Sequence, residues 1–399
     1  MKTFTAPLLA LLFGALSLIS TAPNRMGSAS DQARFDLPFF AERVTIDYDV
    51  TLTVDDPGEV TARNIDRAYA EVRRQPTHSL LTSLLAAKRQ YALNDFLFYK
   101  LARKSVAVIY EGRNRNAQEL TMYGLLIDAG YDARLTYRGQ EIFVNVYTNE
   151  ELFEVPIIDV RGRPYANLSC IDGQCDGRQR LFIHGAQPNP TGKNFSFQLR
   201  SWPKLTAQPK DLNLSFNYQG TLQSLDVTFD QTMVEIMKDY PFIHEYCYME
   251  TPLSPTLRRS LLPQLREMIA PLNEKQSLEL LASFTRSAFN YKEDNENFGR
   301  SKPMVPEELF GYAYSDCEDR SALFYALVRE LMDIPMAVIA YDDHLTIAVG
   351  TETVPGDEFT YDDRRYVFVD PTGPKDSSKI GRIPPGYENK RFKIIGRYK

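Results

Sequence analysis

The last quarter of the chain contains the pattern of a helix and two strands, each marked at one end by a reactive side chain. Cys317 stands directly ahead of a run with helical period, His344 opens the alternating stretch 344–349, and Asp370 closes the stretch 366–370. Alternation with period two is typical of strands, and neighbouring strands bring such positions side by side. The pattern therefore predicts a thiol at a helix N-terminus, an imidazole on one strand and a carboxylate on the next.

The helix at Cys317 has its own start signal. Ser315 and Glu318 fit the Ser-x-x-Glu capping box. The free N–H groups and the dipole of a first helical turn favour an anion. We therefore expect the pKa of the Cys317 thiol to lie below that of a free thiol. An apolar stripe follows at helical spacing, at Phe324, Leu327, Val328 and Leu331.

Taken one at a time, the three reactive residues have ordinary interpretations. A lone Cys before an apolar helix is typically a small core residue, and Asp-Pro-Thr after a strand is turn chemistry. The spacing changes this interpretation, because His344 follows Cys317 by 27 residues (344 − 317) and Asp370 follows His344 by 26 (370 − 344). These intervals leave room for one helix, one strand and a tight turn. A thiol nucleophile, a proton-carrying His and an orienting Asp then form a catalytic triad.

Residues from about 275 to 373, about a quarter of the chain, resemble the transglutaminase-like superfamily of thiol enzymes. Three segments carry the resemblance, together with the strand that His344 opens. They are Ser-Asp-Cys-Glu-Asp-Arg at 315–320, Leu-Met-Asp-Ile-Pro at 331–335 and Tyr-Val-Phe-Val-Asp-Pro-Thr at 366–372. Because the segments agree in order and spacing, the resemblance is far more specific than a lone motif.

The resemblance implies a fold and a role for each residue. The fold class is α+β, with a transglutaminase-like (papain-like) catalytic domain in which the helix that begins at the thiol packs on an antiparallel sheet. Cys317 corresponds to the nucleophile, His344 to the base and Asp370 to the orienting residue. The sequence departs from the family pattern at Asp333, which replaces the usual Gly, and at the Leu after His344, where many members have an aromatic residue. We expect the pocket beside the His to differ accordingly.

Other enzyme classes and metal sites fit the sequence less well. Papain-type enzymes place the His more than a hundred residues after the Cys. The sequence has no Gly-x-Ser-x-Gly elbow, no phosphate loop and no His-Glu-x-x-His motif. The Cys residues, at 170, 175, 247 and 317, lack the paired two-residue spacings of a zinc site, and the four His residues are far apart. We therefore expect no metal site and no cofactor.

The N-terminus has the plan of a secretory signal. Lys2 is followed by an apolar run from Leu8 to Ile19 and then by small residues, with cleavage sites after Ala22 or Ala29. The alternative is a membrane anchor, but the run is short, contains a Gly and directly follows a Pro. We predict a signal peptide over 1–29 and an exported protein, periplasmic or secreted, with no membrane association after cleavage.

Export permits a disulfide bond. Cys170 and Cys175 flank an Asp-Gly pair that is typical of a hairpin turn, which could bring the two sulfurs within reach. We predict a Cys170–Cys175 disulfide. Cys247 lies among aromatic residues and is expected to be a buried thiol, which leaves Cys317 free to react.

The charge balance argues against nucleic acid as a partner. The formal net charge is −6 over 399 residues, and no basic stripe is present. We expect a peptide or protein substrate, with the peptide of a cell wall as one candidate. The oligomeric state stays open.

The mature chain is too long for one core, so several domains are expected. Between 176 and 236 the pattern is strands only, with clean alternation at 195–199 and 214–218. The predicted organisation is a signal peptide over 1–29, an α+β domain over 30–175, a β-sandwich-like domain over 176–240 and the transglutaminase-like catalytic domain over 241–399.

Residues 114–169 resemble a degenerate copy of the catalytic unit. Segment 124–131 runs parallel to 327–334 at an offset of 203 (327 − 124), and segment 165–168 runs parallel to 366–369 at an offset of 201 (366 − 165). Nearly equal offsets are what a duplication requires, although any helix–strand–hairpin unit could produce the same pattern. The positions equivalent to the triad hold Asn114, Glu141 and Ser169, so the copy is expected to be a non-catalytic scaffold or binding module.

The leading functional hypothesis is an exported thiol hydrolase that cleaves amide bonds through an acyl-enzyme on Cys317. The backbone N–H of Cys317 and a second donor, for which Tyr314 is the candidate, would stabilise the oxyanion. If an amine replaces water as the acceptor, the protein is instead a crosslinking transglutaminase. The absence of an Asp-x-Asp calcium loop disfavours a calcium-activated crosslinker. A third alternative is a binding or assembly protein that retains the triad without turnover.

Overall fold

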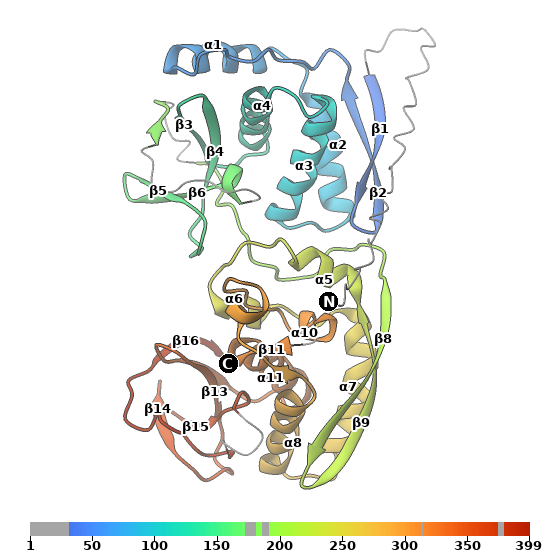
Figure 1. Cartoon of the computed structure of the whole chain (residues 1–399), viewed down its shortest axis with the longest axis vertical. Coiled ribbons are helices and arrows are strands. Elements are labelled where there is room, and N and C mark those ends of the chain that lie inside the picture. Colours follow the sequence, from blue (N-terminus) through green and yellow to red (C-terminus); the bar gives the residue numbers. More distant parts are fainter. Residues whose placement is uncertain (1–31, 172–180, 186–190, 313, 374–378) are drawn as a thin grey trace, which may run out of the picture.

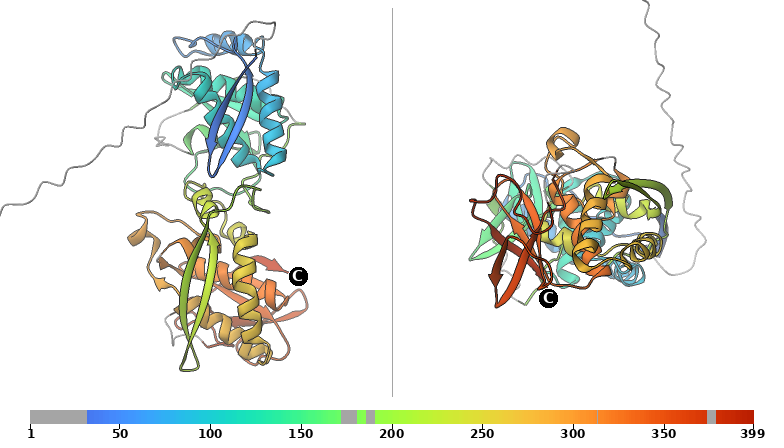
Figure 2. Two further views of the ribbon diagram at one scale, coloured as in Figure 1. Left: turned by 90° about the vertical axis from the view of Figure 1, so that its right-hand side faces the viewer. Right: turned by 90° about the horizontal axis from the view of Figure 1, so that it is seen from below.

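The computed structural model of the chain describes residues 32–171, 181–185, 191–312, 314–373 and 379–399. These residues form two lobes stacked end to end (Figure 1), and the side view in Figure 2 shows the same division. Both lobes contain helices and antiparallel sheets, so the predicted α+β class is confirmed. The predicted signal peptide lies outside the described residues. Within the described residues, no helix is both long enough and apolar enough to cross a membrane.

The first lobe combines a β-hairpin, a group of helices and a five-stranded sheet. Its elements in chain order are β1 (Gln32–Phe39), β2 (Glu42–Asp49), α1 (Ala62–Val72), α2 (His78–Gln90), α3 (Asp95–Ile109), α4 (Arg115–Asp128), β3 (Ala133–Arg138), β4 (Glu141–Tyr147), β5 (Ile157–Val160), β6 (Arg163–Asn167), the 3-10 turn η1 (Leu168–Cys170) and β7 (Phe182–Ile183).

The second lobe repeats the combination of hairpin, helices and five-stranded sheet. Its elements are β8 (Pro209–Tyr218), β9 (Thr221–Asp230), α5 (Gln231–Met237), α6 (Glu245–Glu250), α7 (Pro255–Ile269), α8 (Glu274–Ser287), β10 (Asn290–Tyr291), α9 (Asp294–Asn297), α10 (Glu308–Gly311), β11 (Tyr314–Ser315), α11 (Cys317–Leu331), β12 (Met336–Ala340), β13 (Leu345–Gly350), β14 (Glu358–Tyr361), β15 (Arg364–Val369) and β16 (Lys393–Tyr398).

The two five-stranded sheets have the same strand order. The second sheet runs β14-β15-β13-β12-β16, and the first runs β5-β6-β4-β3-β7, with every pair antiparallel. A helix directly ahead of each sheet packs on it, α11 on β13 and α4 on β3 and β4. Each lobe also carries a hairpin alongside a helix, β1–β2 on α2 and β8–β9 on α7 (Figure 2). The two lobes therefore share one arrangement.

The strand registers reproduce the two sequence offsets. Val349 pairs with Val367 in the second sheet, and Val146 pairs with Ala166 in the first. The equivalent residues are 203 apart on the central strand (349 − 146) and 201 apart on its neighbour (367 − 166). A one-residue slip would turn every side chain to the opposite face of a strand. Matching registers therefore mean that equivalent positions face the same way in both lobes.

The predicted β-sandwich over 176–240 is wrong. Within the described part of that segment, β8 and β9 pair with each other as a two-stranded sheet and pack on α7 and α8. The alternation was correctly interpreted as strands, but it buries one face against helices and not against a second sheet. Segment 195–199 is not a strand either, although its alternate residues Phe195 and Phe197 are fully buried in the first core.

Helix α11 lies at the centre of the second core. It packs against α6, α7, α8 and β13. The predicted stripe is buried at Phe324, Leu327 and Val328, and Leu331 is partly buried. Because neighbours surround the helix, polar residues of its first turns are buried as well, with Asp319 fully buried and Arg320 2% exposed. Buried polar groups need partners, and those partners shape the site.

Glu307 is a buried carboxyl that joins three segments of the second lobe. It is fully buried. It accepts hydrogen bonds from the Asp230 N–H at 2.8 Å, from the Ser254 hydroxyl at 2.9 Å and from the Ser254 N–H at 3.2 Å. Burial nevertheless raises its pKa to about 7, because these donors do not offset the loss of water around the charge.

We expect Glu307 to make the protein less stable as pH rises. Its pKa is raised from 4.5 to about 7 on folding, so the native state holds a proton that the unfolded state has lost. Between these values stability falls with pH, by about 3 kcal/mol in total. Urea unfolding at pH 5 and pH 8 measures the loss. Glu307→Gln should reduce the measured loss by about 3 kcal/mol, whereas Glu267→Gln, an exposed control on α7, should leave the loss unchanged. An unchanged pH slope in Glu307→Gln contradicts the assignment.

Candidate functional site

Cys317 is the first residue of α11, as the sequence predicted. The N-cap is Asp316, with φ −117° and ψ −154°, and its N–H donates to Asp319 Oδ2 at 3.1 Å. The predicted capping box on Ser315 and Glu318 is therefore wrong by one residue. Ser315 instead belongs to β11, which pairs in parallel with β10. This strand pairing holds Ser315 extended, and Asp caps a helix as well as Ser does.

His344 lies in the turn between β12 and β13. The Tyr341 N–H donates to the His344 carbonyl at 2.8 Å and closes that turn. The imidazole side chain is 13% exposed. Its ring lies 4.9 Å from the ring of Tyr387, centre to centre, and 6.5 Å from the ring of Tyr341. The turn and the two aromatic rings therefore fix where the imidazole lies.

Asp370 follows directly after β15 and is 1% exposed. Its Oδ1 atom lies 3.5 Å from His344 Nε2. The same oxygen accepts from the Thr372 hydroxyl at 2.6 Å, the Thr372 N–H at 3.1 Å and the Thr346 hydroxyl at 3.3 Å. Arg286 donates to the Asp370 carbonyl. The carboxylate is thus held in place on the His344 side, where it can orient the ring.

The two ring nitrogens of His344 have different surroundings. Nε2 faces Asp370 and also lies 3.4 Å from the Thr372 hydroxyl. This leaves Nδ1 as the nitrogen that can exchange a proton with the thiol. Cys317 and His344 line one cavity of about 510 Å³, and the backbone N–H of Leu345, next to the His, is directed at Cys317. The structure therefore brings the three predicted triad residues to one site.

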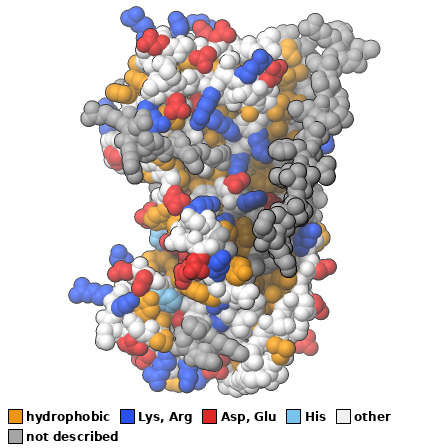
Figure 3. All heavy atoms as spheres, in the orientation of Figure 1, with side chains coloured by type: hydrophobic (Ala, Val, Ile, Leu, Met, Phe, Trp, Pro, Cys, Tyr) orange, Lys and Arg blue, Asp and Glu red, His pale blue; other side chains and the backbone are white. Residues whose placement is uncertain are grey.

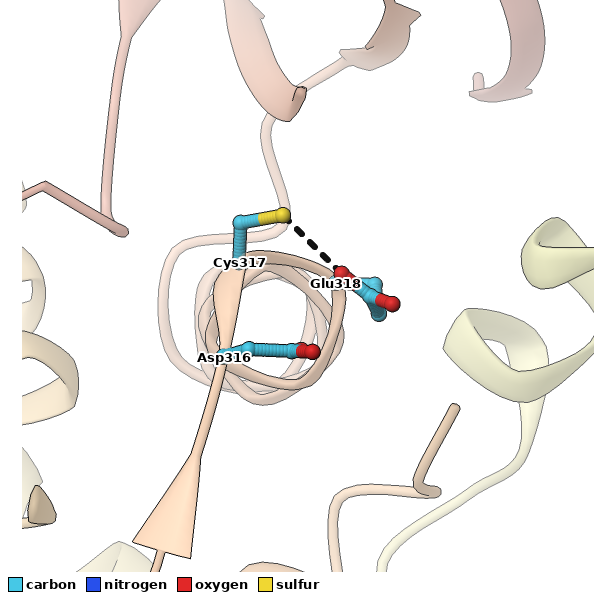
Figure 4. A group of neighbouring side chains, drawn as sticks. All are labelled: Asp316, Cys317 and Glu318. Carbon is cyan, nitrogen blue, oxygen red and sulfur yellow. Dashed lines mark hydrogen bonds between the residues drawn. The ribbon is translucent and has the colours of Figure 1, made fainter. Parts of the chain in front are cut away.

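The thiol of Cys317 is held in its protonated form. Its sulfur donates to Glu318 Oε2 at 2.9 Å (Figure 4). Burial raises the pKa of Cys317 well above its usual value, and the carboxylates of Glu318 and Asp316 raise it further. The sequence-based expectation of a lowered pKa is therefore wrong. The helix dipole contributes about 1 kcal/mol, which is too little to outweigh burial and two nearby carboxylates.

We expect Glu318→Gln to make Cys317 more reactive. The substitution removes a carboxylate next to the sulfur, and one such charge shifts a pKa by about one to three units. The rate of iodoacetamide alkylation against pH should show its inflection above ~8.5 in the wild type and at lower pH in Glu318→Gln. Cys247→Ala in both proteins removes the background from the second thiol. An inflection that stays in place contradicts this account of the raised pKa.

Several carboxylates lie close to Cys317, and the sequence did not predict this cluster. Oxygens of Asp294, Asp316 and Asp319 lie within 4.8 Å of one another, and so do ligand atoms of Asp316, Cys317 and Glu318. Burial raises the pKa values of Asp294, Asp316 and Asp319, and neighbouring carboxylates raise them further. Carboxylate oxygens are the ligands that hard cations prefer, so these residues could hold one. The search for zinc-type Cys and His spacings could not find them.

Arg320 ties the start of α11 to the loop after Asp370. Its Nε donates to the Ser315 hydroxyl at 3.2 Å, its Nη1 to the Thr372 carbonyl at 2.9 Å and its Nη2 to the Phe289 carbonyl at 2.8 Å. The side chain connects the nucleophile's helix to Thr372, which contacts both Asp370 and His344. The Arg lies in the 315–320 motif, but the sequence alone did not show what it would contact.

Tyr314, the predicted second oxyanion donor, lies in β11, and the residue is 38% exposed. The ammonium of Lys292 lies 5.1 Å from the centre of its ring. Tyr314 is not among the described residues that line the cavity around Cys317. Its role in oxyanion binding stays a prediction. The backbone N–H of Cys317 lies in the first turn of α11, where N–H groups have no partner within the helix.

In the first lobe, the positions equivalent to the triad hold residues with other contacts. Asn114 is the N-cap of α4, with φ +55°. The hydroxyl of Ser169 donates to Glu119 at 2.7 Å, and Arg103 lies 2.5 Å from the same carboxylate. Glu141 forms an ion pair at the lobe surface, 3.2 Å from Arg138. This lobe carries no Cys-His-Asp arrangement at these positions, in agreement with the predicted loss of the triad.

Of the three other cysteines, the structure describes Cys170 and Cys247. Cys170 is 6% exposed, and Cys175 lies outside the described residues, so the Cys170–Cys175 disulfide stays a prediction. Cys247 is a free, partly buried thiol. Burial, with the Glu150 and Glu250 carboxylates, raises its pKa to about 12. Cys247 is not among the described residues that line the cavity around Cys317, so it serves as the reference thiol.

Comparison of the chain with family models, with curated proteins and with solved structures finds no match. Inference about function therefore rests on the site itself.

Proposed function

We propose that the protein is a thiol hydrolase of the transglutaminase-like type, which cleaves amide bonds through an acyl-enzyme on Cys317. The observation that carries the proposal is the arrangement of Asp370, His344 and Cys317. Asp370 lies 3.5 Å from Nε2 of His344, and His344 shares a cavity with Cys317 at the start of a helix. These are the roles of orienter, base and nucleophile.

The reaction begins with a proton transfer. His344 takes the proton of the Cys317 thiol as the sulfur attacks the amide carbonyl. Because the resting thiol is protonated and donates to Glu318, this transfer accompanies the attack. The negative charge that develops on the carbonyl oxygen lies near the N–H groups of the first turn of α11, including that of Cys317, which stabilise it.

The acyl-enzyme then forms and breaks down. The amide C–N bond breaks, and the leaving amine takes its proton from the imidazolium of His344. Water next gives a proton to His344 and attacks the thioester carbon. The C–S bond breaks, a carboxylic acid is released and the sulfur recovers its proton. Asp370 stabilises the imidazolium in both halves of the reaction.

The family proposal rests on features along the second lobe. The helix with the thiol at its start precedes an antiparallel sheet, the His directly precedes one strand and the Asp follows the neighbouring strand. This is the order that the resemblance requires. The first lobe repeats the fold without the triad, which suits a scaffold or a binding module. With the signal-like residues 1–29, the proposal is an exported enzyme that acts on peptides or on cell-wall peptide.

A second function has one observation in its favour. The contact of the thiol with Glu318 at 2.9 Å disfavours the reactive thiolate. This contact suits a binding or assembly protein in which the triad does not turn over.

A peptide library separates these functions. Wild type, Cys317→Ala and Cys247→Ala are incubated with the library, with and without a labelled primary amine. We expect cleavage by wild type and Cys247→Ala and none by Cys317→Ala. Incorporation of the amine in place of cleavage identifies a crosslinking transglutaminase. The absence of both reactions in the wild type contradicts the proposed enzyme and favours the binding protein.

A further inference from the structure

We propose that the substrate carries a cationic side chain, lysine or arginine, beside the amide bond that Cys317 attacks, and that carboxylates lining the cavity bind this cation. The inference deepens the proposed function and rests on it for the identity of the site. It follows from the charge of the cavity, from an unpartnered buried oxygen and from a cation that the protein itself places at the edge of the site.

Acidic side chains reach the cavity from separate segments of the second lobe. Glu245 comes from α6, and Glu293 comes from the residue directly ahead of α9. Asp342 and Asp343 come from the exposed turn ahead of His344. Because these segments are far apart in the chain, the acidity is a property of the folded cavity and not of one charge run.

The acidity is concentrated at this cavity. Seven of its fifteen lining residues are Asp or Glu, and none of those described is Lys or Arg, whereas the whole chain has 52 Asp and Glu among 399 residues. On the face drawn in Figure 3, Lys and Arg are interspersed with Asp and Glu over both lobes. A concave site lined with one sign of charge concentrates ligands of the opposite sign.

Asp316, next to the nucleophile, gives an independent sign of a missing donor. It lines the cavity and is 3% exposed. Its Oδ1 atom is buried and has no hydrogen-bond partner among the described residues. A buried oxygen without a donor is costly, and an ammonium or guanidinium group supplies several N–H donors at once. A cationic side chain bound here would satisfy that oxygen.

The protein's own Lys390 shows how a cation sits at the edge of the site. Its ammonium lies 3.1 Å from Asp343 and 4.0 Å from the centre of the Tyr387 ring. The ring of Tyr387 in turn lies 4.9 Å from the ring of His344, centre to centre. A carboxylate beside an aromatic face is a favourable place for a cation. Lys390 is exposed, so its ion pair with Asp343 is weak.

The test measures binding separately from turnover. Full-length Cys317→Ala is titrated with fluorescent peptides that are identical except for Lys, norleucine or Glu beside the scissile amide, in buffer with EDTA so that no divalent cation competes. We expect the Lys peptide to bind at least about tenfold more tightly than the norleucine peptide, with the Glu peptide weakest. This preference should shrink at high salt.

Two carboxylate variants on different segments locate the preference. The first variant combines Asp342→Asn with Asp343→Asn, since Asn also suits a turn. The second is Glu293→Gln. Each variant should reduce the ratio of the affinity for the Lys peptide to that for the norleucine peptide. Glu267→Gln, on the surface of α7, is the matched control and should retain it. Equal affinity for the Lys and norleucine peptides overturns the proposal, and so does a preference that both cavity variants leave intact. A Lys preference in binding without any turnover by the wild type overturns the proposed hydrolase alone.

Discussion

Replacing Cys317 with Ala should lower peptide cleavage by roughly 10⁴- to 10⁶-fold, which is the scale on which loss of a nucleophile acts in a triad. The sulfur is the only protein atom in the proposed reaction that bonds to the substrate carbon. Ala removes it with little change in volume, and Cys317 begins a helix whose cap is held by Asp316 and Asp319. We therefore expect the fold to survive. Steady-state kcat/KM and circular dichroism measure the two effects.

Cys247→Ala is the matched control for that loss. Cys247 is the other free thiol among the described residues, and its raised pKa disfavours the thiolate. Its replacement should leave kcat/KM within a few-fold of the wild type. Cleavage that persists in Cys317→Ala at more than a hundredth of the wild-type rate means that the nucleophile lies elsewhere.

Asp370→Asn should lower turnover by about a thousand-fold. The amide can still accept hydrogen bonds from Thr346 and Thr372, but it no longer stabilises an imidazolium and it permits the wrong tautomer of His344. The same change in a serine triad costs about 10⁴-fold. A thiol enzyme with a preformed thiolate would lose less. Here the resting thiol is protonated against Glu318, so His344 must act as a full base and the loss approaches that of the serine case.

Single-turnover acylation of Asp370→Asn and Cys317→Ala gives the comparison. We expect the loss in Asp370→Asn to be smaller than that in Cys317→Ala, because the nucleophile itself remains. Wild-type acylation in Asp370→Asn means that Asp370 only caps the end of β15. The hydrogen bonds from Thr372 would then serve the turn, and the third member of the triad would have to be sought elsewhere.

Local periodicity predicted the elements that carry the triad. The spacing at 324–331 indicated α11, and the alternation at 344–349 and 366–370 indicated β13 and β15, because each element buries a continuous face. The internal repeat could also be recognised in the sequence, because the strand registers preserve the residue offsets between the two lobes. Alternation does not say what covers the buried face of a strand, so it does not distinguish the β8–β9 hairpin on α7 and α8 from a strand pair in a sandwich.

The side-chain contacts of the site could not be predicted from the sequence. Ser315 with Glu318 and Asp316 with Asp319 both fit a capping box, and only the pairing of β10 with β11 decides between them. The sign of the shift in the Cys317 pKa was missed for a related reason. A helix N-terminus favours a thiolate, but the direction in which Glu318 turns, and the depth at which the sulfur lies, depend on the packed core around α11.

The central claim is that Cys317 forms an acyl-enzyme with His344 as its base, and intact-mass analysis tests it most directly. Wild type, His344→Ala and Cys317→Ala are mixed with a peptide ester whose good leaving group permits fast acylation, and the reaction is quenched in acid within seconds. We predict that one acyl group is added to the wild type, is mapped to Cys317, forms much more slowly in His344→Ala and is absent from Cys317→Ala. An adduct on Cys247, or one that forms on Cys317 equally fast without His344, contradicts the claim.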